Sequence, residues 1–491
     1  MKLIRAVSII IFMSIGLLSM SQVGTFTKMF TSNSYDEGIA AFRMPNKTYR
    51  LIANTGAWGW GSNNIWYIVL DSNANFVRHK TMGYGAIDKA TAATMDSKGN
   101  IYIVGYSTSD ANNSYQMLLV ALDSSGALLY QKYFGGSDWD FGNGISMIND
   151  TTLILVGETY SYANQQSNAW VLKVKNSGDI IWSKSFGGSK KEAFYAVDEA
   201  KNGDLICVGN SQSYGNGSFD PYMIRSSSNG DSLESIILKD STDGCFLDVK
   251  VGKDSTYYVG GYQRDTLDAY SDFLLHHYSK DNQFLWSGDF LLHYQDGYYN
   301  TMAFHDNNLL AFGMNTKHGS SGKNIYCDKI NANNGVWMKG FVGGDKGDES
   351  AYSVSTDTSN NQTHYLIIGT STSYNMVHTG VYFMRTNYDL EFDTTMVIDF
   401  PSAIEPIIDN KSSFDINYNI ADNNLIINKL NSKLGNYYSV KVYDILGKCV
   451  FSGLWNTYEA SYSINTNSWS KSVYFVVIES DEISFSHKII K

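Results

Sequence analysis

The chain contains few cysteines, few prolines and fewer basic than acidic residues. Four Cys and four Pro occur among 491 residues, and Lys plus Arg total 37 against 48 for Asp plus Glu. The formal net charge of -11 argues against nucleic acid as a partner, because phosphate binding needs clustered positive charge. The one long apolar run lies near the amino terminus, so we expect no transmembrane segment in the mature chain.

Sequence signatures of catalysis are also missing. No Gly-x-Ser-x-Gly elbow, phosphate-binding loop or dinucleotide fingerprint occurs. Five of the nine histidines fall between His276 and His318, but none has a metal-ligand spacing such as His-x-x-x-His, so we predict no metal and no cofactor. Paired carboxylates for glycoside cleavage can meet in space without a sequence signature, so an enzymatic activity is less expected than binding but stays open.

The most regular feature is a 52-residue repeat that occurs seven times between residues 25 and 400. Its marker is a glycine that ends a short apolar run, in the series Gly105, Gly157, Gly209, Gly261 and Gly313, with Ala53 in the first copy and a late Gly369 in the last. Each copy holds four short runs rich in β-branched and aromatic residues and separated by turn residues, which predicts four strands. Solenoid coils are shorter, so the sequence predicts an all-β fold whose first part is a seven-bladed β-propeller.

The repeat also predicts how the ring closes. The segment Phe26–Phe30 lies 156 residues, three repeats, before residues 182–186, so the chain begins with what looks like a fourth strand. We expect this strand to complete the last blade and to leave few free edges. Residues 391–398 are a rival for the same place.

Residues 130–136, 182–188 and 337–344 share an aromatic residue, a lysine, a phenylalanine and a glycine pair. They resemble the seven-bladed β-propeller repeats of bacterial surface proteins. Copies four and five depart from this pattern, since they lack the glycine pair. The resemblance implies a fold and carries over no single chemistry.

The amino terminus has the features of an export signal. Lys2 and Arg5 precede the apolar residues 6–18, and small residues follow up to Ser21. We expect residues 1–21 to be a cleaved signal peptide that leaves Gln22 first. Exported cysteines can oxidise; we expect buried free thiols, and the best disulfide pairing would join Cys207 to Cys245.

The carboxyl end is a separate module. The repeat stops near Phe400, and residues 401–411, which include Pro401 and Pro406, form an expected linker. Residues 412–491 contain about seven short alternating strands, which predicts a small immunoglobulin-like β-sandwich. Residues 442–448, 473–475 and 488–491 closely resemble motifs of the type A sorting domain of the type IX secretion system of Bacteroidetes. The usual proline-asparagine-proline opening is absent, and Ser472 replaces a glycine. The resemblance implies that the type IX machinery is a partner and that the protein is secreted or held at the cell surface after crossing the periplasm and outer membrane.

Candidate ligand-binding residues gather on the propeller face that carries the loops entering each blade and the loops between second and third strands. Aromatic rings with nearby carboxylates suit sugars, whose C–H faces stack while their hydroxyls form hydrogen bonds. Most aromatic residues fill cores, and that remains the alternative for each ring. The candidates are Trp58, Trp60, Asp138, Trp139, Asp140, Tyr160, Tyr162, Tyr214 and Tyr374.

One acidic residue recurs in each repeat on the same face. Asp36, Asp88, Asp140 and Glu192 are spaced by 52, and Asp243, Asp296 and Asp348 continue the series within one residue. Aspartate in a turn binds nearby backbone N–H groups, so we interpret this acidic ring as structural, with a cation site as the alternative.

We therefore expect an exported surface or extracellular protein whose propeller recognises a glycan or a protein partner. A carbohydrate-active hydrolase or lyase with its site at the pore mouth is the second hypothesis. A structural surface component is the third.

Overall fold

The computed structural model describes most of the chain between residues 24 and 491. The described residues are 24–32, 34–57, 63–83, 87–109, 114–163, 165–215, 217–239, 243–264, 270–288, 296–316, 322–344, 347–359, 362–373, 378–391, 396–399, 414–419, 423–429, 437–444, 448–456, 461–470, 472–479 and 484–491. Every regular element among them is a β-strand. The expected signal peptide and its cleavage position, Ser21 and Gln22, lie outside the described residues.

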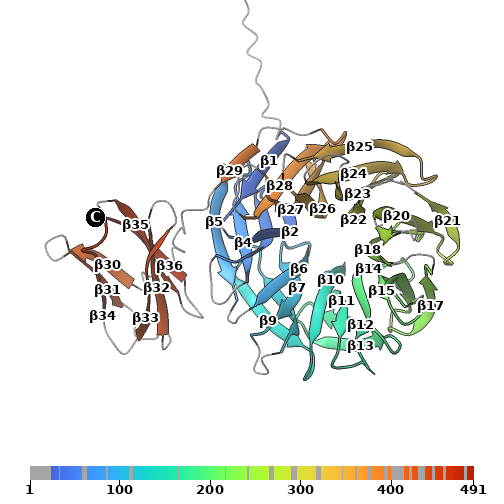
Figure 1. The fold of residues 1–491 in the computed structure, drawn as a ribbon, viewed down its shortest axis with the longest axis horizontal. Coiled ribbons are helices and arrows are strands. Elements are labelled where there is room, and N and C mark those ends of the chain that lie inside the picture. Colours follow the sequence, from blue (N-terminus) through green and yellow to red (C-terminus); the bar gives the residue numbers. More distant parts are fainter. Residues whose placement is uncertain are drawn as a thin grey trace, which may run out of the picture.

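Seven sheets stand around a ring, as predicted from the repeat (Figure 1). The strands of blades 1 and 2 are β2 (Asp36–Arg43), β3 (Tyr49–Thr55), β4 (Asn64–Leu70), β5 (Phe76–Met82), β6 (Asp88–Met95), β7 (Ile101–Ser107), β8 (Gln116–Leu122) and β9 (Leu128–Phe134). Those of blades 3 and 4 are β10 (Asp140–Asn149), β11 (Thr152–Thr159), β12 (Asn168–Lys175), β13 (Ile180–Phe186), β14 (Glu192–Glu199), β15 (Leu205–Ser211), β16 (Asp220–Ser226) and β17 (Ser232–Ile237).

The remaining strands of the ring continue the same order. Blades 5 and 6 contain β18 (Asp243–Val251), β19 (Tyr257–Arg264), β20 (Ser271–Tyr278), β21 (Phe284–Ser287), β22 (Gly297–His305), β23 (Asn308–Thr316), β24 (Lys323–Asn331) and β25 (Trp337–Gly343). Blade 7 is formed by β26 (Glu349–Ser359), β27 (Gln362–Ser371), β28 (Gly380–Asn387), β1 (Phe26–Phe30) and β29 (Met396–Asp399).

Blade 7 closes the ring with strands from both ends of the propeller. β1 pairs antiparallel with β28, so the predicted closing strand is confirmed. β29, which belongs to the rival segment, pairs in parallel with the outer side of β1 and adds a fifth strand. Both candidates therefore take part, in neighbouring places, and β1 and β29 lie side by side in Figure 1.

The marker glycine has a steric cause. A Cβ atom at Gly157 would lie 1.9 Å from the carbonyl oxygen of Phe141 on the neighbouring inner strand. Equivalent glycines meet the inner strand of their own blades in the same way. In blade 1 the marker is Ala53, and its partner on the inner strand is Gly38.

Side chains of the second and third strands fill the spaces between blades. Trp66 and Tyr49 are buried in the cluster that joins blades 7 and 1, together with Phe30 of the closing strand. At the outer strands the lysine that recurs in the repeat links neighbouring blades. Lys132 forms an ion pair with Asp179 of the next blade, 2.7 Å away, and Lys184 forms one with Asp231 at 3.3 Å.

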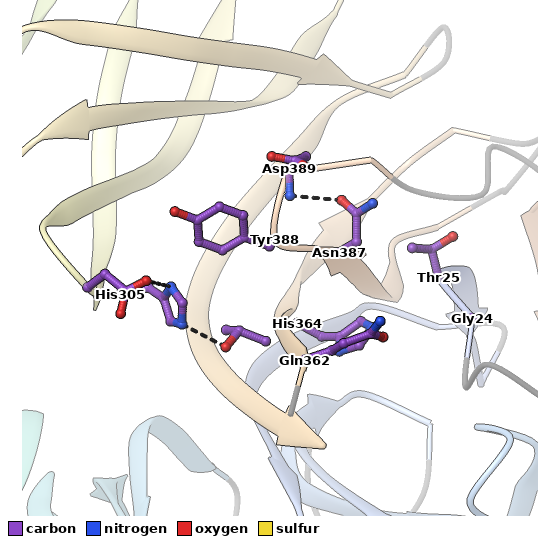
Figure 2. Close-up of a pocket in the computed structure, with 10 residues that line it drawn as sticks. Gly24, Thr25, His305, Gln362, His364, Asn387, Tyr388 and Asp389 are labelled. Carbon is purple, nitrogen blue, oxygen red and sulfur yellow. Dashed lines mark hydrogen bonds and ion pairs between the residues drawn. The ribbon is translucent and has the colours of Figure 1, made fainter. Parts of the chain in front are cut away.

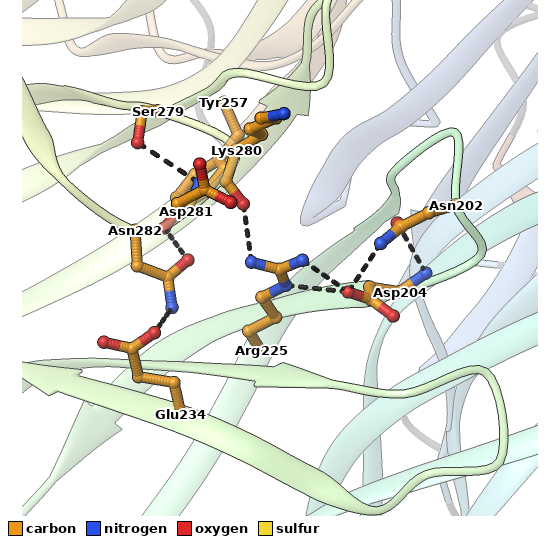
Figure 3. Close-up of polar contacts among 9 residues, drawn as sticks. All are labelled: Asn202, Asp204, Arg225, Glu234, Tyr257, Ser279, Lys280, Asp281 and Asn282. Atoms are coloured by element: carbon orange, nitrogen blue, oxygen red, sulfur yellow. Dashed lines mark hydrogen bonds and ion pairs between the residues drawn. The ribbon is translucent and has the colours of Figure 1, made fainter.

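Blades 4 and 5, whose outer strands lack the lysine-containing pattern, are linked differently (Figure 3). Arg225 of β16 donates to the Asp204 carboxylate at 2.8 Å and to the Lys280 carbonyl of the next blade at 2.5 Å. Glu234 accepts a hydrogen bond from Asn282, whose amide oxygen accepts one from Tyr257 at 2.6 Å. These polar contacts replace the lysine link at the point where the repeat pattern fails.

The carboxyl-terminal part forms two sheets, as predicted for a small sandwich. One sheet contains β30 (Phe414–Asn419), β31 (Asn424–Lys429) and β34 (Ser461–Asn465). The other contains β33 (Cys449–Asn456), β32 (Tyr437–Asp444), β35 (Val473–Glu479) and β36 (Ser484–Ile490). Trp455, Tyr438 and Val440 are fully buried in its core, and the Lys491 ammonium donates to the Trp469 carbonyl at 2.7 Å.

The four cysteines are free in the structure, with Cys207, Cys245 and Cys327 buried and Cys449 exposed. Burial raises the pKa of the Cys207 and Cys245 thiols above the usual range, which makes them poor nucleophiles. In the part of the chain that the structure describes, no helix has the length and hydrophobicity of a membrane span.

Candidate functional site

Trp139 and Tyr162 are the most exposed of the predicted aromatic residues that the structure describes. Half of the Trp139 side chain is exposed, at the entry to blade 3. Asp138, beside it, is exposed and accepts a hydrogen bond from the Trp139 N–H at 2.8 Å. Trp58, Trp60 and Tyr374 lie outside the described residues.

Trp139 belongs to a cluster of five aromatic rings, which we call the aromatic surface: Tyr106, Tyr115, Trp139, Phe141 and Tyr160. The Trp139 ring lies 5.8 Å from Tyr115 and 6.0 Å from Tyr160 between centroids. Phe141 lies 5.2 Å from both Tyr106 and Tyr115. The loops of blades 2 and 3 thus supply the outer rings, and their strands supply Phe141 and Tyr106.

The aromatic surface leads to an ion pair on the innermost strands. Lys89 of β6 lies 3.0 Å from the Glu37 carboxylate of β2, and both side chains are 29% exposed. Lys89 is also the direct cross-strand neighbour of Tyr106. Burial alone would lower the pKa of Lys89, but the Glu37 carboxylate outweighs it and raises the pKa.

Further tyrosines lie on the first and second strands of other blades. Withdrawal from water, followed by the charge of Glu37, raises the pKa of the Tyr352 hydroxyl on the inner strand of blade 7. Tyr262 and Tyr298 meet edge to face at 4.6 Å. Because these side chains come from strands, their positions are fixed more firmly than those of loop residues.

Sequence reasoning missed these inner residues. Tyr106 and Tyr262 directly follow the marker glycines Gly105 and Gly261, so their place on the second strand was readable from the repeat. Tyr298 and Tyr352 lie on first strands, at different positions within the repeat. The 52-residue period therefore does not relate all four tyrosines to one another.

Tyr162 and Tyr214 lie apart from the aromatic surface. The Tyr162 hydroxyl donates to the Gly135 carbonyl at 2.8 Å, and its ring packs 5.5 Å from Trp170. Tyr214 packs 5.7 Å from Tyr222 and lines a separate cavity at the outer edge of blades 3 and 4. The structure therefore does not bring the predicted aromatic residues into one group.

The recurrent acids are buried caps at the start of the inner strands. Glu192 is fully buried and accepts hydrogen bonds from the Gly188 N–H at 2.8 Å, the Ser213 N–H at 3.0 Å and the Ser211 hydroxyl at 2.9 Å. Asp140 accepts from the Gly136 N–H at 2.9 Å and from the Ser161 hydroxyl at 2.6 Å. Each acid thus ties the turn that leaves the preceding blade to the second strand of its own blade.

Asp36 and Asp88 hold the same place. Ser32 donates to Asp36 through its N–H at 2.6 Å, and Ser107 and Ser109 donate to Asp88. Burial outweighs these hydrogen bonds and raises the pKa of Asp36 to about 6. The signal that sequence reasoning overlooked is a Ser or Thr at 19 and often at 21 positions after the acid.

In blades 5 to 7 the register of the predicted acidic ring differs. The buried place in blade 7 is held by Glu349, which accepts from the Ser371 hydroxyl at 2.8 Å, and Asp348 is its neighbour. Asp348 and Asp296 instead accept the N–H groups of Lys323 and Ser271, at 2.8 and 2.9 Å. Asp243 is only partly buried. A shift of one residue along a strand turns the side chain to the opposite face of the sheet. Acids that lie within one residue of the 52-residue series therefore do not occupy equivalent places.

No group of three or more His, Cys, Asp or Glu side chains within the described ranges is arranged to hold a metal ion. The buried acids are occupied by N–H and O–H donors from their own and the preceding blade.

A polar cavity of about 610 Å³ opens on the opposite face, between the turns of blades 6 and 7 (Figure 2). His305 and His364 both line it, although their sequence positions suggested no such pairing. His305 contacts the Thr363 hydroxyl at 2.6 Å and the Asp306 carboxylate at 3.4 Å. Burial, followed by the charge of Arg385, lowers the pKa of His364.

Residues 419–491 match the family model of the secretion system C-terminal sorting domain. This sorting domain interacts with the type IX secretion machinery, and the protein is secreted or attached to the cell surface by that route. The buried core of Tyr438, Val440 and Trp455 belongs to it.

The chain is also similar to solved structures of low sequence identity. Sqt1 from Chaetomium thermophilum is 13% identical with a TM-score of 0.44, over 72% of this chain and 86% of that chain. PorZ, a surface component of the type IX secretion system of Porphyromonas gingivalis, is 11% identical with a TM-score of 0.39, over 91% of this chain and 64% of that chain. The propeller domain of the Trilobed protease from Pyrococcus furiosus is 9% identical with a TM-score of 0.42, over 74% of this chain and 97% of that chain. No curated protein matches the chain.

Proposed function

We propose that the propeller of this exported protein is a glycan-binding module. The ligand site is the aromatic surface together with the Glu37–Lys89 pair. The observation that carries the proposal is the unbroken series of close contacts from the half-exposed Trp139 through Phe141 and Tyr106 to Lys89.

The chemistry of this series suits a sugar chain. Trp139 and the rings behind it offer faces and edges for the C–H groups of pyranose rings, and such stacking is worth about 0.5–1.5 kcal/mol per ring beyond the buried area. Asp138 and Glu37 supply acceptors for hydroxyl groups, and Lys89 supplies a donor. A cation and a carboxylate at 3.0 Å neutralise each other, so the site has no strong preference for a charged ligand.

A glycan array probed with the full-length protein tests the proposal, followed by titration of the best ligand by calorimetry. Trp139→Ala should weaken binding about tenfold, which corresponds to 1.4 kcal/mol. Trp337→Ala is the matched control, because Trp337 is equally exposed, at 51% against 50%, but lies on the outer strand of blade 6. Its affinity for the glycan should equal that of the unchanged protein.

Two results would contradict the proposal. One is the absence of any glycan that binds in a saturable manner, and the other is an unchanged affinity in Trp139→Ala. Polysaccharides that contain the glycans bound on the array should be incubated with the protein and assayed for new reducing ends or unsaturated products. Their appearance would assign a hydrolase or lyase activity to the site in place of simple binding.

A further inference from the structure

Two grooves at the outer edge of the ring occupy equivalent places in the repeat, and the chain fills one of them. The filled groove lies between blades 6 and 7. There the added strand β29 places Met396 against a core that contains Tyr382 and Met384, next to Phe341 of the preceding blade. An outer edge of this propeller can therefore accept an additional strand.

The second groove lies between blades 3 and 4 and has the same walls. Tyr222 and Ile224 stand on β16 where Tyr382 and Met384 stand on β28, since Tyr222 pairs with Ile237 of the outer strand as Tyr382 pairs with Met29. Phe186 of β13 packs against the core that contains Tyr222 and Ile224, as Phe341 of β25 packs against the core that contains Tyr382 and Met384. These side chains line a cavity of about 650 Å³.

The outer strands of the two blades differ in burial. In blade 7, Thr27, Lys28 and Met29 are 3%, 7% and 0% exposed. In blade 4 the outer strand β17 is exposed along most of its length, including Ser235, which holds the place of Thr27. Thr27 is the residue that pairs with Met396.

The backbone of β17 is suitably oriented for a further strand. β17 is the last strand of its sheet in the described structure. The N–H of Leu238, which directly follows it, bonds inward to the Pro221 carbonyl at 3.1 Å. Successive backbone groups of a strand alternate in direction, so the N–H groups of Ile237 and Ser235 point outward.

Whether the groove is open depends on the size of the aromatic side chain at one position of the third strand. In blades 1 and 3 this position holds Trp66 and Trp170, whose indole N–H groups reach His79 and Ser183 of their outer strands at 2.9 and 2.8 Å. In blade 4 the smaller Tyr222 stands there. Ser183 is the counterpart of Ser235, so a tryptophan in blade 4 would extend over the groove.

We propose that the groove between blades 3 and 4 binds an extended polypeptide segment of a partner protein, which pairs in parallel with β17 as a fifth strand. Strand addition gives affinity through main-chain hydrogen bonds, while alternate side chains give specificity. The register of β29 defines the segment: a large apolar residue opposite Ser235, a variable residue next, and a second apolar residue opposite Ile237. The variable place corresponds to Val397, which is 42% exposed.

The probe is a fluorescein-labelled peptide with the sequence of residues 394–400, TTMVIDF, added to the full-length protein and followed by fluorescence anisotropy. The matched control peptide carries serine at the positions of Met396 and Ile398. We expect saturable binding of the first peptide and at least tenfold weaker binding of the second.

Two protein variants separate the groove from the rest of the surface. Tyr222→Trp gives blade 4 the residue of blades 1 and 3, and Ser235→Pro removes one outward N–H from an edge strand, where proline is tolerated. Each should weaken binding at least tenfold with an unchanged melting temperature. Ser235→Thr, which gives β17 the residue of β1, should bind as the unchanged protein does.

A photo-crosslinking version of the peptide identifies the site by mass spectrometry. Crosslinks to β13, β16 or β17 support the proposal. Crosslinks to β1 would instead show exchange with β29 and overturn it, as would equal binding of both peptides, full affinity in Tyr222→Trp, or no binding. If the peptide does not bind and sedimentation shows a dimer that Tyr222→Trp dissociates, the groove is a self-association surface and the proposal fails.

Discussion

The buried acids predict a specific cost for removing the cap of blade 4. Glu192→Ala eliminates three hydrogen bonds, from the Gly188 N–H, the Ser213 N–H and the Ser211 hydroxyl. The Ser213 N–H keeps a second acceptor, the Ser211 oxygen at 3.0 Å. The Gly188 N–H and the Ser211 hydroxyl lose theirs.

The magnitude follows from these two groups. A buried donor left without an acceptor costs about 1–3 kcal/mol, so two of them give roughly 2–6 kcal/mol. Glu192 is fully buried, and removal of its carboxylate recovers part of the desolvation energy. We therefore expect a loss of about 3 kcal/mol in the free energy of unfolding. Glu192→Gln keeps an acceptor oxygen and should lose about 1 kcal/mol.

Urea unfolding of the full-length protein, followed by tryptophan fluorescence, measures the global effect. Hydrogen exchange measures the local one, because the Gly188 amide should lose protection in Glu192→Ala. Asp231→Ala is the control, since it breaks an ion pair whose side chains are 44% and 68% exposed and should cost under about 1 kcal/mol. If Glu192→Ala is as stable as this control and Gly188 stays protected, the cap does not act as described.

Three further expectations can be tested directly. Phe30→Ala in the closing strand, at a fully buried position, should cost about 3–5 kcal/mol in urea unfolding, whereas Val397→Ala should cost under about 1 kcal/mol; equal losses would contradict closure by β1. Burial lowers the pKa of His79 in the folded protein to about 4, so the unfolded chain binds the proton first and stability is lost as the pH falls from 6.5 towards 4, by about 2 kcal/mol at pH 5. His79→Gln keeps an acceptor for Trp66 and should show a correspondingly smaller loss between pH 7 and 5 in calorimetry. Removal of residues 410–491 should abolish appearance outside the cell while the propeller folds in the periplasm, and immunoblots of medium, surface and periplasm would reveal normal secretion if this expectation is wrong.

The propeller ring could be predicted because the close contact that shapes each blade recurs along the sequence. A glycine such as Gly157 recurs wherever the second strand approaches the inner strand too closely for a side chain, and that contact has the period of the blade. Among the described residues, the fifth strand of blade 7 has no counterpart in the other blades. Its parallel pairing with β1 is therefore absent from the repeat, and two segments competed for what proved to be two places.

The candidate site was less readable because it combines contacts of different origin. Trp139 could be found from its turn, but Glu37 and Lys89 meet only because blades 1 and 2 are neighbours at the ring axis. The acids show the limit of spacing arguments. A shift of one residue separates the buried Glu349 from Asp348, and only the pairing of the strand decides which one enters the cap.

Closure by β1 also sets the order in which the molecule can fold. Arg385 donates to the Gly24 carbonyl, 361 positions earlier in the chain, at 3.2 Å. Contacts of such separation form late, because the intervening loop must first lose its entropy. β1 is synthesised first, yet its partner β28 follows six complete blades. We therefore expect blade 7 to form in the slowest step of folding, and that same step brings the chain entering the propeller and the chain leaving it to a common edge.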